Sequence, residues 1–292
     1  MAVTSVKNTH LDGKEMSVYL KAALFGALIG TAALPAMAQT ATTMESVTSA
    51  TAKTVAQTSY AYVTSTTGAD VTQKTSDTIS ITTDCSGWVS YNLRGFTTAY
   101  QDVQAYQTKV SGEAGKPFPR ADVYRQYFAN LPAGASFTQV QKLSDIQPGD
   151  ILAWCLPGYC DNGYTGTPAT DTGHVMVVMS APITNDANSA FLMVLDSSTV
   201  THYSFETLPA AVQTANPGLA ATFSQYPDVR EQTLSDGKLS TNGVGPGFIL
   251  FGTNSDGAIS SFQFGPGDTV HSANILFAVG RLNPNVAYTT PQ

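Results

Sequence analysis

The fold depends on one stretch of sequence, which runs Asp84-Cys85-Ser86-Gly87-Trp88-Val89-Ser90-Tyr91-Asn92-Leu93-Arg94-Gly95. Asp84 is a favourable N-cap and Gly95 a favourable C-cap, so the sequence predicts a helix over residues 85–94. Cys85 occupies the first turn of that helix, and Gly87 leaves room for a sheet to approach closely. We therefore expect the compact part of the chain to begin near Asp84.

Strand patterns dominate further along the chain. A second helix is predicted over residues 120–130, where apolar residues recur at helical spacing. Beyond it, short apolar runs bounded by turn residues predict strands at 151–155, 174–179, 191–195, 248–252, 258–264 and 275–281. A short helix is expected at 208–214, and Asn254-Ser255-Asp256-Gly257 predicts a hairpin turn. Because helices come first and strands later, the sequence predicts an α+β fold with a helix packed on an antiparallel sheet.

The residues ahead of Asp84 divide into two segments. Lys21, the apolar run 22–33 and Ala36-Met37-Ala38 follow the charged, apolar and small-residue order of a secretory signal, which predicts cleavage after Ala38. The apolar run is too short to span a bilayer, so we expect no stable membrane anchor after cleavage. Residues 39–83 are rich in Ser and Thr and are interpreted as a surface helix plus linker. The expected organisation is a signal peptide over 1–38, this linker, and one domain over 84–292 of a periplasmic or secreted protein.

Charge and cysteine content narrow the function. The net charge of −7 gives no support for nucleic-acid binding, which needs a clustered basic face. Export permits disulfides, and Cys155 and Cys160 flank a Pro-Gly turn that brings them together, so we expect a disulfide or two free thiols. Cys85 is left over, and an odd cysteine in a secreted chain is a candidate reactive thiol. Cys155, Cys160 and His174 match no common zinc pattern, so no metal or other cofactor is expected.

The position of Cys85 favours a nucleophile. At a helix start, the dipole and the free amide N–H groups stabilise a thiolate and can later face the oxyanion of a tetrahedral intermediate. The dipole alone contributes only about 0.3–1 kcal/mol, so a catalytic thiolate also needs a histidine. The alternative is that Cys85 is a small buried hydrophobe, as free cysteines often are.

His174 is the best candidate base, because it opens an apolar strand where a loop meets the core. If that strand and the strand at 191–195 form a hairpin centred on Asn185, His174 lies directly opposite Asp196, with Cβ atoms about 4.5–5.5 Å apart. Asp196 then orients the imidazole as the third member of a triad. A one-residue slip of register would remove this pairing. His202 is expected at the surface, with a place lining the cleft as the alternative, and His271 in a solvated loop.

Three motifs in this order resemble the NlpC-type cell-wall cysteine peptidases of the papain-like superfamily. They are Asp84-Cys85-Ser86-Gly87-Trp88-Val89, Pro148-Gly149-Asp150-Ile151-Leu152 and Gly173-His174-Val175-Met176-Val177. The resemblance covers residues 84–196 and implies a papain-like fold with the nucleophile helix on an antiparallel sheet. It also implies Cys85 as nucleophile, His174 as base and a third polar residue, which we map to Asp196. Inserts at 97–119 and 157–172, and the hairpin after Gly247, depart from the family pattern.

The resemblance further implies hydrolysis of an amide bond in peptidoglycan stem peptides or a related peptide. Asp84, Ser86, Trp88 and Gly173 are then expected at the substrate site. Two alternatives stay open. The same thioester could be captured by an amine, giving acyl transfer, or the protein could be a non-catalytic envelope binding protein, because the insert before His174 could narrow the cleft.

Overall fold

The computed structural model describes residues 42–73, 75–110, 112–159, 171–226, 230, 232–233, 239–240 and 242–291. The chain separates into two compact units, 1–40 and 41–292, and all described residues belong to the second. The predicted signal segment 1–38 and Cys160 therefore lie outside the described residues. Within the described part of the chain, no helix has the length and apolar character needed to cross a membrane.

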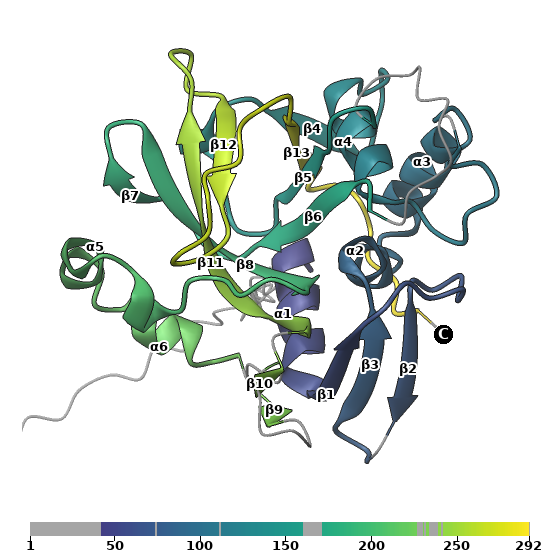
Figure 1. Cartoon of the computed structure of the whole chain (residues 1–292). Helices are drawn as coiled ribbons and strands as arrows, with labels where there is room; N and C mark the ends of the chain where they lie inside the picture. Colours follow the sequence, from purple (N-terminus) through teal and green to yellow (C-terminus); the bar gives the residue numbers. More distant parts are fainter. Residues whose placement is uncertain are drawn as a thin grey trace, which may run out of the picture. The chain divides into compact units, whose positions relative to one another are not determined.

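A large antiparallel sheet forms the centre of the described unit (Figure 1). Its strand order is β12-β11-β8-β6-β5-β13-β4, and β7 pairs with β8 off this path. The strands are β4 (Phe137–Val140), β5 (Ile151–Cys155), β6 (Gly173–Val178), β7 (Ile183–Asp186), β8 (Ser189–Ser198), β11 (Gly243–Thr253), β12 (Ile259–Gln263) and β13 (Leu276–Leu282). All its pairings are antiparallel, which confirms the predicted α+β class. The predicted hairpin at Asn254–Gly257 is also confirmed, since it joins β11 to β12.

Helices pack against the middle of this sheet. The predicted first helix is α2 (Cys85–Leu93), which contacts β6 and β8, and the predicted second helix is α4 (Ala121–Ala129), which contacts β5, β6 and β13. Both predictions are confirmed. Strands β5, β6 and β8 are almost wholly buried, which explains why each appears in the sequence as a continuous apolar run. The sheet thus brings β6 and β8 next to the helix that begins at Cys85.

Residues 39–83 were expected to form a surface helix plus linker; the helix is present, but strands take the place of the linker. Residues 44–54 form α1 (Met44–Thr54), which packs on α2 and β6, and β1 (Val55–Tyr60) follows without a break. With β2 (Ala69–Gln73) and β3 (Ile79–Thr83), β1 forms a second sheet of order β1-β3-β2, visible beside α2 in Figure 1. The threonines that weaken a long helix favour strands, and here they supply this sheet. Because β3 ends at Thr83, the small sheet leads directly into Asp84.

Further elements lie around this framework. The insert at 97–119 contains α3 (Thr97–Gln107), which the sequence did not predict, and β4 was also missed. The short helix expected at 208–214 is α5 (Ala210–Ala215), followed by α6 (Leu219–Phe223). The remaining short elements are the 3₁₀ turns η1 (Leu143–Asp145) and η2 (Phe205–Thr207), and the strands β9 (Gln232–Thr233) and β10 (Leu239–Ser240).

Candidate active site

Asp84 sets the start of α2 as the sequence predicts. Its carboxylate accepts hydrogen bonds from the Gly87 amide at 2.6 Å and from the Ser86 hydroxyl at 2.8 Å. Burial raises the pKa of the Asp84 carboxyl, although these donors oppose the rise. Cys85 is a free thiol in the first turn and only 6% exposed. The N-cap therefore holds the thiol at the point where amide N–H groups lack helical partners.

Gly87 brings this helix close to the small sheet. A Cβ at Gly87 would overlap the backbone oxygen of Gly68, which lies just before β2, and the hydroxyl of Thr83. The close approach expected of Gly87 is confirmed. Ser86 and Trp88, expected at the substrate site, have buried side chains that make structural contacts. The Ser86 hydroxyl donates to Asp84, and Trp88 is 0% exposed in the core.

Gly173 has a backbone role at the start of β6. Its φ is +137°, a conformation that side chains rarely adopt, and a Cβ there would overlap the carbonyl oxygen of Trp154. This contact lets β5 and β6 meet at their ends, where Trp154 lies directly opposite His174. The two rings are 5.2 Å apart between centroids, so the indole limits the orientations of the imidazole.

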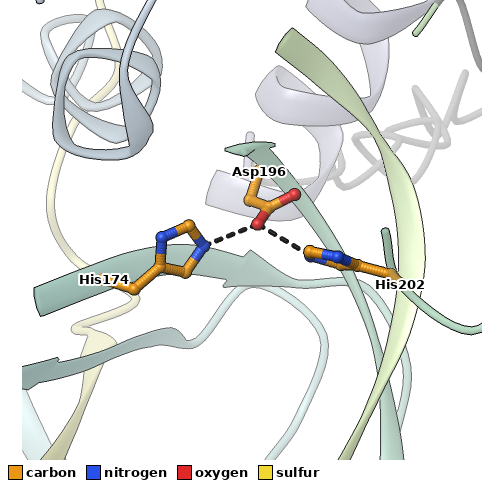
Figure 2. A group of neighbouring side chains, drawn as sticks. All are labelled: His174, Asp196 and His202. Atoms are coloured by element: carbon orange, nitrogen blue, oxygen red, sulfur yellow. Dashed lines mark hydrogen bonds and ion pairs between the residues drawn. The ribbon is translucent and has the colours of Figure 1, made fainter. Parts of the chain in front are cut away.

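His174 and Asp196 meet, although the predicted register is wrong by two residues. In the structure Val177 pairs with Leu195, so Asp196 is diagonal to His174 and not directly opposite it. A shift of two keeps both side chains on one face of the sheet, because side chains alternate with a period of two. The Nε2 atom of His174 donates to the Oδ2 atom of Asp196 at 2.6 Å (Figure 2).

Cys85 and Asp196 both act on the His174 ring. Burial disfavours the imidazolium, yet the negative Cys85 sulfur and hydrogen bonds with Asp196 and Cys85 outweigh it and raise the pKa of His174 to about 10. Since Nε2 is bonded to Asp196, Nδ1 is the nitrogen left for the thiol, and it points away from Asp196 in Figure 2. The three predicted catalytic residues are thus brought together.

His202 belongs to this site, so its predicted surface position is wrong. It is 5% exposed, and its Nε2 lies 2.9 Å from the same Asp196 Oδ2 atom that His174 contacts (Figure 2). No periodic signal could have located it, because the segment after β8 is irregular and is placed by an isolated bridge between Tyr203 and Phe248. His271 is half-exposed beside Asp268, as expected.

Two further residues near the site were also missed. Arg230 Nη1 lies 3.7 Å from Asp196 Oδ1, while the two imidazoles lie against Oδ2 of the same buried carboxylate. Burial disfavours the charged carboxylate, but His202 and the hydrogen bond from His174 outweigh it and hold the pKa of Asp196 well below its usual range. Tyr60 ends β1, and partial burial together with the negative charges of Cys85 and Asp84 raises the pKa of its phenol far above the usual range.

The same side chains also resemble a candidate metal centre. Among the described residues, His174, Asp196 and His202 offer ligand atoms that lie within 4.8 Å of one another. Both imidazoles, however, are already hydrogen-bonded to one oxygen of Asp196, and Arg230 lies near the other. A cation would have to break both hydrogen bonds beside a guanidinium. The geometry therefore fits a hydrogen-bonded relay better than a metal site.

Cys155 is disulfide-bonded, while Cys85 is free. The predicted partner of Cys155 is Cys160, which lies outside the described residues. None of the protein-family models, curated proteins or solved structures compared with this chain matches it. The functional argument therefore rests on the side chains around Cys85.

Proposed function

We propose that the protein is an exported thiol hydrolase of papain-like fold that cleaves an amide bond through an acyl-enzyme on Cys85. One observation carries the proposal: the free thiol in the first turn of α2 interacts with His174 and raises its pKa, and the Nε2 atom of His174 is hydrogen-bonded to Asp196. A base near a thiol, and a third group that orients the base, are what thiol-dependent acyl transfer needs. The signal-like residues 21–38 support export.

The reaction follows from these positions. The Cys85 thiolate attacks the substrate carbonyl, a C–S bond forms, and the amide N–H of Cys85 faces the resulting oxyanion. As the C–N bond breaks, His174 gives its Nδ1 proton to the leaving amine, and a thioester remains. Neutral His174 then takes a proton from water, whose oxygen bonds to the thioester carbon. The C–S bond breaks, the acid is released, and the Cys85 thiolate and protonated His174 are restored. General acid–base help of this kind contributes about 10²–10⁴-fold to the rate.

Peptidoglycan stem peptides are the proposed substrate. The support is the order of the three motifs, which lie on adjoining elements: Cys85 on α2, the Pro148-Gly149-Asp150 turn before β5, and His174 on β6. Asp150 secures its turn by accepting from Arg281 Nε and from the Gln147 amide, both at 2.8 Å. This turn positions β5, whose Trp154 contacts the catalytic ring.

Thiol alkylation tests the site. Iodoacetamide at pH 7 should label Cys85 readily in the native protein and much more slowly in His174→Gln. The matched control is His271→Gln, which removes the His271–Asp268 pair away from the site. This variant should leave the labelling of Cys85 unchanged. A Cys85 that reacts no faster in the native protein than in His174→Gln would refute the proposal.

Purified muropeptides test the reaction. Mass analysis should show fragments that have gained water, and Cys85→Ala should abolish them. Products joined to an added amine would instead establish acyl transfer on the same thioester. No change in any muropeptide, with a reactive Cys85, would reject the substrate class.

A further inference from the structure

We propose that His202 is a positioning residue that shares the Asp196 carboxylate with His174. A protonated His202 ring partly neutralises Asp196, so Asp196 orients His174 without binding its proton too strongly. The inference rests on the proposed function, in which His174 must hold a proton and later release it. It concerns a residue that has no place in the Cys85, His174 and Asp196 triad expected from the sequence.

The hydrogen-bond partners of His202 define its protonation. Its Nε2 lies 2.9 Å from the Asp196 carboxylate and its Nδ1 lies 2.9 Å from the carbonyl oxygen of Val200. Both partners can only accept, whereas a neutral imidazole carries a single N–H. Both contacts are hydrogen bonds only if both ring nitrogens carry a proton. The geometry thus places a positive ring on the carboxylate that also holds His174.

The fold makes a specific place for this ring. A Cβ at Gly247 would overlap the Cβ of His202, so β11 can pass beneath the imidazole only because Gly247 has no side chain. Phe264 contacts both imidazoles, with its ring centroid 5.2 Å from that of His202 and 5.6 Å from that of His174. The two histidines are therefore held on either side of Asp196, as Figure 2 shows.

A positive charge on His202 should make His174 a better acid, because it weakens the attraction of Asp196 for the His174 proton. A buried aspartate that served His174 alone would hold the imidazolium strongly, because charges attract more in a low-dielectric interior than in water. A ring so held is a poor acid for the leaving amine. With His202 on the same oxygen, Asp196 still orients His174 but attracts its proton less.

Other titratable or charged groups act near this pair. Cys85 acts on His174, Arg230 and Tyr60 act on Asp196, and Asp84 and Asp171 act on Tyr60. Cys85 is replaced in both proteins of the test, and the other groups are retained in both.

The test follows the His174 ring by NMR as pH is varied. The whole chain carries Cys85→Ala, so that the thiol does not titrate with the ring, and His202→Gln is compared with His202 retained. Loss of a positive charge less than 5 Å away should raise the titration midpoint of His174 by roughly one to two pH units, a ten- to hundredfold change in proton affinity. His271→Gln is the matched control and should leave the midpoint unchanged.

The alternatives predict different results. If His202 only supports the local structure, its loss loosens the contact with Asp196, and the midpoint of His174 falls or stays the same. Either result would overturn the proposal. If His202→Gln does not fold, ¹⁵N shifts of the native protein at neutral pH decide, because the proposal requires both His202 nitrogens to carry protons. Neither measurement depends on turnover, so failure here is separate from failure of the hydrolase proposal.

Discussion

Asp196→Asn should destabilise the protein strongly, with a characteristic dependence on pH. Asp196 is fully buried and one of its oxygens lies 2.6 and 2.9 Å from two imidazoles. Removing one partner of a buried charged group costs about 3–5 kcal/mol, because the other charges are left uncompensated. Asparagine keeps one acceptor oxygen, so we expect the free energy of unfolding to fall by about 3 kcal/mol near pH 6.

The pKa directions define the pH window. The folded pKa of Asp196 lies below its unfolded value near 3.9, so its contribution is present above about pH 4 and is lost in stronger acid. The pKa of His174 is raised from 6.5 to about 10, so its contribution is complete below pH 6.5 and is lost as pH rises toward 10. The cost of Asp196→Asn should therefore be largest between about pH 4 and 6.5 and should shrink toward pH 10.

Urea unfolding at pH 6, 8 and 10 measures this cost, provided that the slope with urea stays constant. The control is Asp268→Asn, which removes the partner of the half-exposed His271 and should cost less than about 1 kcal/mol. Equal costs for the two variants, or a cost of Asp196→Asn that grows with pH, would refute the electrostatic reasoning.

Three further predictions concern other parts of the unit. Gly87→Ala should lower the thermal midpoint and reduce Cys85 alkylation, because the added Cβ overlaps the Gly68 backbone; unchanged values would contradict the close approach. Burial and Glu113 raise the pKa of Asp122 to about 6, so the native protein should lose up to about 3 kcal/mol of stability as pH rises from about 4 through 6. Urea titrations of Asp122→Asn should show no such loss over this pH range. Peptide mass mapping without reductant should find Cys155 in a disulfide and Cys85 alkylated; a bridge through Cys85 would contradict the site.

Local signals in the sequence were sufficient for α2 and for the β11–β12 hairpin. A capping carboxylate and an Asn-Ser-Asp-Gly turn act within a few residues, so their outcome does not depend on the rest of the chain. Gly95, expected to cap α2, instead leaves room for the ring of Tyr288, which is a long-range contact. The presence of β1, β2 and β3 could not be predicted in the same way. The parallel pairing of β1 with β3 depends on contacts between separate segments, and the Ser- and Thr-rich composition of both resembles a linker.

At the site, too, local features could be predicted from the sequence and long-range contacts could not. The sequence by itself determined that Cys85 begins a helix, because a helix cap is a local property. That His174 and Asp196 share one face of the sheet depends on how β6 and β8 pair, and an even shift of register preserves it. Only the tertiary structure decided the two-residue shift in register and the place of His202 on Asp196. That place depends on the bridge from Tyr203 to Phe248, a contact between segments far apart in the sequence that no local pattern encodes.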